Sequence, residues 1–327
     1  RFFSSLFNTA SRQKRPTGPS ATGGQRNEKN RRSAAVSEKV CIFVAMKRGL
    51  VLEGGGLRSL FSAGIMDVMM DEGIRFDGII GVSAGATFGC NYKSHQPGRA
   101  LRYNMRFRHD PRYISLRNWL TTGDLVGAEF SYHTMPRELD IFDRETFAAD
   151  ASAFYVVCTD VLSGRPVYHR IDEMDDEEMD WLRASASMPV VSRPVQIGGQ
   201  RLLDGGISDS IPLEFFQREG YERCIVILTQ PAGFRKRRTR LLPVIRLAMR
   251  RYPAIVEAMR RRHEMYNAQL DYLAEQQARG NILLIQPEEP LRIGRTEMRA
   301  DKMQRVYDLG RQTGKEYLPR IIDFLSA

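Results

Sequence analysis

The sequence has few cysteines, few histidines and no long apolar run, and each scarcity excludes a class of protein. Its four cysteines, in 327 residues, stand far apart without a C-x-x-C pair, so neither a zinc site nor a disulfide framework is predicted. The pattern instead indicates buried free thiols in a reducing compartment, which favours the cytoplasm. No apolar run approaches the roughly 18 residues that span a bilayer, so no transmembrane helix is predicted.

Net positive charge is also scarce beyond the N-terminal segment. The whole chain carries a formal +10, but residues 1–48 hold eleven Lys and Arg against two Glu, which leaves about +1 (10 − 9) for the rest. We expect residues 1–46, rich in Ser, Arg, Gly and Asn, to form a disordered basic tail, with a transit peptide as the alternative. The folded domain is expected over 47–327. Because the basicity belongs to the tail, no nucleic-acid partner is predicted.

From residue 47 onward, short apolar runs alternate with helical spacing of apolar residues. Strands are expected at Gly49–Glu53, Gly78–Val82, Ala153–Cys158, Arg165–Tyr168, Val195–Ile197, Arg201–Leu203, Cys224–Thr229 and Ile282–Ile285. Helices are expected after Gly54–Gly56, from Ala84, at Trp181–Ser187, over 243–278 and near the C-terminus. This alternation predicts an α/β fold, in which helices cover both faces of a largely parallel sheet.

The pentapeptide Gly81-Val82-Ser83-Ala84-Gly85 follows directly on an expected strand and precedes an expected helix. A strand that enters G-x-S-x-G and then a helix is typical of a nucleophile elbow. Glycine at the two flanking positions, Gly81 and Gly85, avoids side-chain clashes in the sharp turn and leaves the serine hydroxyl exposed. Ser83 is therefore a candidate nucleophile.

A second glycine-rich element, Glu53-Gly54-Gly55-Gly56-Leu57-Arg58, lies between the first strand and its helix. Successive glycines expose backbone N–H groups, and a helix N-terminus adds partial positive charge, so the element can bind an anion. It lacks the Lys-Ser/Thr of a P-loop and the spacing of a dinucleotide fingerprint. Beside a nucleophile elbow it favours an oxyanion hole. A plain strand-to-helix turn is the alternative.

The candidate base for Ser83 is an aspartate. None of the five histidines lies in a glycine-marked loop after a strand, although His169 lies near a strand end and keeps a conventional triad open. Asp204, in Leu203-Asp204-Gly205-Gly206, follows a strand and is left accessible by two glycines. A carboxylate that burial makes more basic can deprotonate a serine. A simple turn aspartate is the alternative interpretation.

Taken in order, G-G-G-x-R, G-V-S-A-G and D-G-G, with Arg183–Pro189 (RASASMP) before the last, resemble the patatin-like phospholipase family over about residues 47–290. The resemblance implies a three-layer α/β/α fold and hydrolysis of acyl esters in lipids without a metal or cofactor. It also implies a Ser–Asp dyad, with Ser83 as nucleophile and Asp204 as base. Gly54, Gly55 and Gly56 would supply oxyanion N–H groups, and Arg58 would add positive charge nearby. The chain departs from many members in having Ser59 after this arginine.

Two charged stretches lie outside these motifs. Residues 235–262 carry eleven Lys and Arg against one Glu, with interspersed apolar residues, which is compatible with a peripheral membrane contact or with a core-packed helix that has a solvated basic face. Asp172–Asp180 contains seven acidic residues but lacks the ligand spacing of a calcium loop. We expect it to be a solvated run that leads into the helix at Trp181.

The sequence therefore predicts a serine lipid acyl hydrolase of the phospholipase or lysophospholipase type. Its expected partner is a lipid or another acyl-ester substrate. A general carboxylesterase or thioesterase on the same fold remains an alternative, as does a non-catalytic lipid-binding protein.

Overall fold

A computed structural model describes residues 46–326. The expectation of a basic tail over 1–46 therefore lies outside the described residues, apart from Met46. The other expectations from the sequence can be compared with the unit that begins at Ala45.

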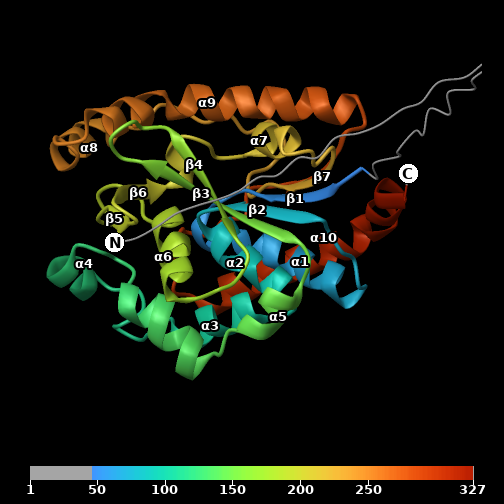
Figure 1. The fold of residues 1–327 in the computed structure, drawn as a ribbon, viewed down its shortest axis with the longest axis horizontal. Coiled ribbons are helices and arrows are strands. Elements are labelled where there is room, and N and C mark those ends of the chain that lie inside the picture. Colours follow the sequence, from blue (N-terminus) through green and yellow to red (C-terminus); the bar gives the residue numbers. More distant parts are fainter. Residues whose placement is uncertain (1–45, 327) are drawn as a thin grey trace, which may run out of the picture. The chain divides into compact units, whose positions relative to one another are not determined.

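The centre of this unit is an eight-stranded, mostly parallel sheet (Figure 1). Its strands are β1 (Arg48–Leu52), β2 (Gly78–Val82), β3 (Ala153–Asp160), β4 (Pro166–Ile171), β5 (Val195–Ile197), β6 (Gln200–Asp204), β7 (Arg223–Ile227) and β8 (Ile282–Ile285). Strands β3, β2, β1, β7 and β8 are parallel neighbours, and β4, β6 and β5 add antiparallel pairs at the β3 side. The predicted α/β fold with a largely parallel sheet is confirmed.

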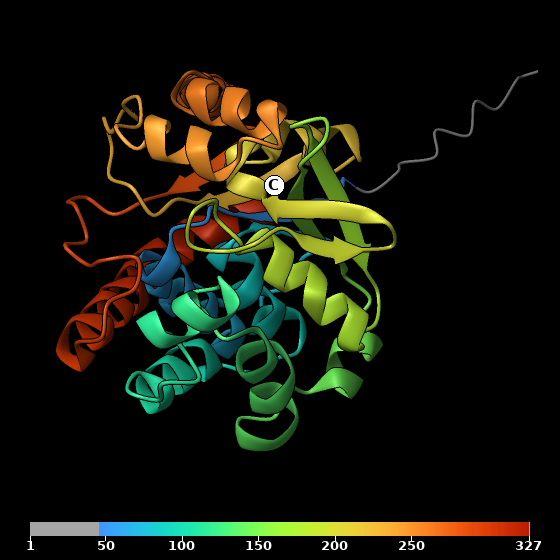
Figure 2. The same cartoon turned by 90° about the vertical axis from the view of Figure 1, so that its left-hand side faces the viewer.

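Helices cover both faces of the sheet, as the two views in Figures 1 and 2 show. They are α1 (Leu60–Asp71), α2 (Ala84–Lys93), α3 (Arg99–Phe107), α4 (Leu116–Thr122), α5 (Arg144–Ala149), α6 (Asp176–Ser185), α7 (Leu213–Arg218), α8 (Leu242–Ala248), α9 (Pro253–Ala278) and α10 (Ala300–Ser326), with a π-type helix at Phe130–Leu139. In Figure 1, α7, α8 and α9 lie above the sheet, and α1, α2, α3, α5 and α10 lie below it.

Alternate residues of the central strands β1 and β2 belong to two different hydrophobic cores, one on each face of the sheet. Leu50 and Leu52 of β1 belong to the core between the sheet and α1, whereas Val51 belongs to the core on the other face, with Tyr266 of α9. Side chains alternate between the faces of a strand, so a continuous apolar run is what a sheet covered on both sides requires.

Helices α1 and α10 approach closely through glycine. A Cβ atom on Gly64 would clash with the carbonyl of Tyr307, and one on Gly310 would clash with the carbonyl of Phe61. The C-terminal helix therefore packs directly on the helix that follows the first glycine-rich element. Within the described residues, no helix combines the length and the apolar character needed to cross a membrane.

Two local expectations are wrong. The stretch 243–278 is not one helix: it breaks after α8, and α9 begins at Pro253, whose missing N–H and fixed φ suit the first position of a helix. The acidic run does not merely lead into the helix at Trp181. The side chain of Asp175 accepts a hydrogen bond from the N–H of Glu178 (2.8 Å) and caps α6, whose first turn is acidic. Carboxylates there are stabilised by the helix dipole.

Three of the four cysteines, Cys90, Cys158 and Cys224, are free and buried, as the sequence pattern predicts. Cys41 lies outside the described residues.

Candidate active site

Ser83 occupies the sharp turn between β2 and α2, with φ 56° and ψ −126°. A non-glycine residue seldom adopts a positive φ, and such strain is held only where the surroundings fix it. A Cβ on Gly81 would lie 2.6 Å from Cα of Ala86, and one on Gly85 would lie 2.5 Å from the carbonyl oxygen of Leu52. Both glycines are therefore sterically required, as the elbow interpretation expects.

The side chain of Ser185, at the end of α6, holds the strained backbone of Ser83. Its hydroxyl accepts a hydrogen bond from the N–H of Ser83 (2.9 Å) and donates one to the carbonyl of Val157 on β3 (2.6 Å). Sequence reasoning noted the surrounding RASASMP segment but assigned no role to this serine. The side chain of Ser185 is fully buried.

Asp204 ends β6 and is 2% exposed. Its carboxylate accepts a hydrogen bond from the N–H of Gly206 (2.7 Å), and its own N–H donates to the carbonyl of Ser187 (2.8 Å). Burial raises the pKa of Asp204, and the nearby charge of Arg262, the Ser83 side chain and the N–H of Gly206 oppose this increase. The structure thus brings together the two residues, 121 positions apart, that were predicted as a dyad.

The three glycines of the first motif lie against the elbow. A Cβ on Gly54 would lie 2.8 Å from Cβ of Ser83, and Gly56 adopts φ +59°. Within the described part of the chain, the N–H groups of Gly54, Gly55 and Gly56 donate to no protein acceptor. They remain available to an oxygen placed beside Ser83.

A buried carboxylate that sequence reasoning missed supports this loop from beneath. Glu53 accepts hydrogen bonds from the N–H of Thr229 (2.7 Å) and from the hydroxyl of Tyr266 (2.7 Å). The hydroxyl of Thr229 also lies 3.1 Å from the carbonyl oxygen of Gly54. Because these partners follow β7 and lie on α9, no local signal at Glu53 could have revealed them.

Arg58 is half-buried beside the same loop. Its Nε is buried without a hydrogen-bond acceptor among the described residues. Burial lowers the pKa of Arg58, and the positive charge of Arg295 lowers it further. The positive charge that the sequence placed near the glycine loop is present, together with further cations that it did not predict.

Two cavities meet at Ser83 and Asp204, which line both. The larger, of about 410 Å³, has a mostly apolar lining that includes Leu57, Phe88, Ile114, Met135, Leu182 and Met188. The smaller, of about 50 Å³, is lined by the glycine loop and by the cations Arg58, Lys236, Arg262 and Arg295. A substrate ester at Ser83 would therefore face an apolar space on one side and a cationic one on the other.

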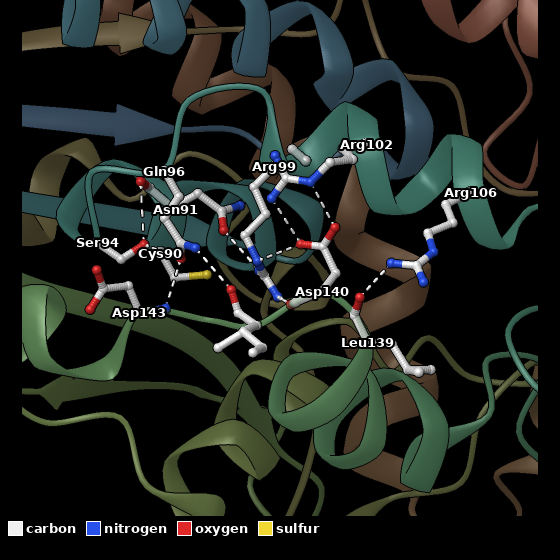
Figure 3. A network of polar contacts seen from close by, with 12 residues as sticks. Cys90, Asn91, Ser94, Gln96, Arg99, Arg102, Arg106, Leu139, Asp140 and Asp143 are labelled. Atoms are coloured by element: carbon white, nitrogen blue, oxygen red, sulfur yellow. Dashed lines mark hydrogen bonds and ion pairs between the residues drawn. The ribbon is translucent and has the colours of Figure 1, made fainter.

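One wall of the larger cavity is fixed by the buried polar network of Figure 3. Arg99 of α3, which lines the cavity, pairs with Asp140 (3.1 Å) and donates to the side chain of Asn91 on α2 (2.9 Å). Arg102 binds the same carboxylate from the exposed side (2.8 Å). The charges of Arg99 and Asp140 are thus paired within the protein. This wall therefore shapes the apolar cavity and offers it no unpaired charge.

No histidine lines either cavity, although all five belong to the described residues. The Nε2 of His169 lies 2.7 Å from a carboxylate oxygen of Glu178, and its ring stacks on Trp181 with centroids 3.9 Å apart. His169 is therefore held in a surface pair away from Ser83, and its geometry does not support a conventional triad.

Comparison with known protein families gives a match over the half of the chain that contains these motifs. A family model described as patatin-like phospholipase matches residues 50–216, just over half of the chain. The chain belongs to the patatin-like phospholipase family. A second model, described as a domain of unknown function (DUF6363), matches residues 252–326. This C-terminal match includes α9 and α10.

Several curated proteins are similar to this chain in sequence. The uncharacterized protein YjjU of Escherichia coli K12 is 28% identical over 284 residues, which cover 83% of this chain and 77% of YjjU. The lysophospholipase NTE1 of Kluyveromyces lactis is 27% identical over 57% of this chain, and its Aspergillus fumigatus counterpart is 28% identical over 53%. This chain spans only 12% and 11% of those two lysophospholipases. Among solved structures, VipD from Legionella pneumophila aligns with a TM-score of 0.43 at 14% identity, over 84% of this chain and 67% of VipD.

Proposed function

We propose that this patatin-like protein is a serine hydrolase of lipid acyl esters, of the phospholipase or lysophospholipase type. The observation that carries the proposal is the strained Ser83, which lines the end of an apolar cavity together with the buried carboxylate of Asp204. The family match and the lysophospholipase relatives support lipid ester hydrolysis. The assignment of catalytic roles to individual residues is our inference from the geometry.

In the first half of the reaction, the Oγ of Ser83 attacks the ester carbonyl as Asp204 takes its proton. Burial increases the basicity of this carboxylate and so favours the transfer. The developing oxyanion is stabilised by the free N–H groups of the Gly54–Gly56 loop. The leaving alcohol takes the proton from Asp204, and an acyl-enzyme on Ser83 remains.

In the second half, Asp204 deprotonates a water molecule that attacks the acyl-enzyme, and Ser83 recovers its proton as the fatty acid leaves. The apolar cavity of about 410 Å³ is suited to hold the acyl chain throughout. This apolar volume favours a lipid over a small soluble ester. A carboxylesterase or thioesterase remains the alternative because the same cavity accepts other acyl groups.

The first test compares Ser83→Ala, Asp204→Asn and His169→Ala on a phospholipid, a lysophospholipid and a soluble thioester with equal acyl chains. The first two variants should reduce turnover by at least a thousandfold while unfolding normally in urea. The third serves as the matched control and should retain most of the activity, also in excess chelator. Full activity of Ser83→Ala would contradict the assigned nucleophile, and a thousandfold loss in His169→Ala would restore the triad. Binding of lipid without turnover by the wild type would favour a lipid-binding protein.

We further propose that α8 makes the peripheral membrane contact. Within residues 235–262, Ile255 and Met259 are core residues, but Leu241, Val244 and Leu247 are 61%, 48% and 73% exposed. Exposed arginines accompany them, namely Arg237, Arg238, Arg240, Arg246, Arg250 and Arg251. Apolar side chains among cations are suited to an anionic lipid surface.

Sedimentation with vesicles tests this contact. A Leu241→Ser/Leu247→Ser variant should lose several-fold in binding to vesicles that contain an anionic lipid, whereas Ile141→Ser, at a 65% exposed residue elsewhere, should bind like the wild type. Equal binding of all three proteins would contradict the contact.

A further inference from the structure

Four cationic side chains from four separate segments meet in the small cavity beside Ser83. Arg58 follows the glycine loop, Lys236 follows β7, Arg262 lies on α9, and Arg295 lies between β8 and α10. Arg58, Lys236 and Arg262 are half-buried, and Arg295 is exposed at the rim. The last three all lie beyond residue 216, where the patatin-like match ends.

None of the four forms an ion pair with another described residue. Neighbouring arginines of the same region do: Arg235 pairs with Asp271, and both Arg260 and Arg261 pair with Glu257. The unpaired cations therefore do not follow from a general lack of acidic residues nearby. They gather at one place, which is the cavity that Ser83 lines.

The two carboxylates near this cavity are already engaged. Glu53 accepts from Thr229 and Tyr266, and Asp204 accepts from the N–H of Gly206. The cations instead have uncharged partners: the Nε of Arg262 donates to the carbonyl of Gly206 (2.5 Å), and the Nζ of Lys236 lies 3.8 Å from the ring centre of Tyr266.

The cations also perturb one another. Burial lowers the pKa of Lys236 to about 7, and the charges of Arg262, Arg295 and Arg58 contribute to this decrease. Burial and the charge of Arg295 likewise lower the pKa of Arg262. The charge of Asp204 on Arg262, and that of Glu53 on all three half-buried cations, partly offset these decreases, but no ion pair forms. Partly desolvated cations that repel one another without an ion-pair partner favour the binding of an anion, which would relieve both effects.

The size and position of the cavity limit what this anion can be. About 50 Å³ leaves no room for an acyl chain. Because Ser83 lines both cavities, a substrate with its acyl chain in the apolar one places its alcohol portion toward the cations. An oxyanion of the carbonyl itself is served by the glycine N–H groups, so the cations are left for a second negative charge.

We propose that Lys236, Arg262 and Arg295, together with Arg58, form a subsite for the phosphate of an acyl-ester lipid, carried on the alcohol that leaves from Ser83. This inference rests on the proposed function and specifies its substrate class. It predicts selectivity for phosphate-bearing acyl esters over neutral esters with the same chain. It also gives the region after residue 216 a direct part in substrate recognition.

The kinetic test uses two substrates that differ only in the phosphate, 1-palmitoyl lysophosphatidate and 1-monopalmitoylglycerol. The wild type should have the higher kcat/KM on lysophosphatidate. The ratio of kcat/KM on lysophosphatidate to kcat/KM on monopalmitoylglycerol should fall by about tenfold to a hundredfold in Lys236→Gln and in Arg262→Gln. This is the usual range for a charge-assisted hydrogen bond. Arg261→Gln is the matched control, because Arg261 is the neighbouring exposed arginine and pairs with Glu257. An unchanged ratio in both subsite variants would overturn the proposal.

A binding arm separates this proposal from the proposed function, because it needs no turnover. In the Ser83→Ala protein, lysophosphatidate should bind at least tenfold more tightly than monopalmitoylglycerol, and adding Lys236→Gln should remove the difference. Equal binding of the two lipids would overturn the subsite even if hydrolysis is confirmed. Inorganic phosphate that binds as tightly as lysophosphatidate would overturn the lipid assignment in favour of a site for the free anion.

Discussion

The replacement Ser185→Ala isolates the contact that holds the strained elbow. It removes one hydroxyl, which accepts from the N–H of Ser83 (2.9 Å) and donates to the carbonyl of Val157 (2.6 Å). A buried polar group left without its partner costs about 1–3 kcal/mol, and the N–H of Ser83 has no other acceptor among the described residues. We therefore expect a loss of about 1–3 kcal/mol in the free energy of unfolding.

The matched control is Ser187→Ala, two residues further along. The hydroxyl of Ser187 donates only to the carbonyl of Arg183 (2.8 Å), which also accepts from the N–H of Ala186 (3.1 Å) and so keeps a partner. Urea unfolding should show a smaller loss for this variant. The rate of Ser83 labelling by a fluorophosphonate should fall at least tenfold in Ser185→Ala, because the relaxed backbone moves the nucleophile away from Asp204. Equal stability and equal labelling of the two variants would contradict the role of Ser185 in holding the turn at Ser83.

Three further predictions concern burial, packing and pH. Burial raises the pKa of Asp67 to about 6, so the folded state loses stability as pH rises from about 4 to about 6, where the unfolded chain is already ionised. Asp67→Asn keeps an acceptor for the hydroxyl of Tyr307. In urea titrations this replacement should raise the free energy of unfolding by about 2–3 kcal/mol at pH 7.5 and by little at pH 4. A lower free energy of unfolding at pH 7.5 would contradict this prediction. Gly310→Ala, at the contact of α1 with α10, should lower the free energy of unfolding by about 1–3 kcal/mol or more in the same titrations. Its control is Gly294→Ala, where an added Cβ would have no atom nearer than 4.0 Å, so the free energy of unfolding should change by less than about 0.5 kcal/mol. Equal effects of the two replacements would show that α10 is not tightly packed. Burial raises the pKa of Asp204, so the rate of fluorophosphonate labelling should fall toward acid pH with a midpoint above 3.8. A labelling rate that does not change between about pH 4 and about pH 8 would contradict the role of Asp204 as base.

The elements that the sequence predicts well are those with local causes. The apolar residues of Gly78–Val82 form the predicted buried strand, and Gly81 and Gly85 are needed for the turn around Ser83. Both signals lie within a few residues, so no knowledge of distant contacts is required. Asp204 was a candidate base because it follows a strand and precedes two glycines, and the resemblance to a family implied its pairing with Ser83, since their spacing in the chain carries no such information.

The features that the sequence did not predict depend on contacts between distant segments. Ser185 is one of several serines in its segment, and only the packing of α6 against β3 gives it a role. Lys236 and Arg262 were assigned to a basic stretch with a solvated face, yet the fold turns both toward the cavity at Ser83. Their charge was visible in the sequence, but its direction depends on how α9 lies on the sheet.

Intact-mass analysis after fluorophosphonate labelling shows whether Ser83 is an activated nucleophile. We expect a single adduct on the wild-type protein, none on Ser83→Ala, and strongly slowed labelling of Asp204→Asn, with all three proteins folded. A folded wild type that takes no adduct, or a Ser83→Ala variant that is labelled as fast as the wild type, would contradict the claim that Ser83 is a nucleophile activated by Asp204.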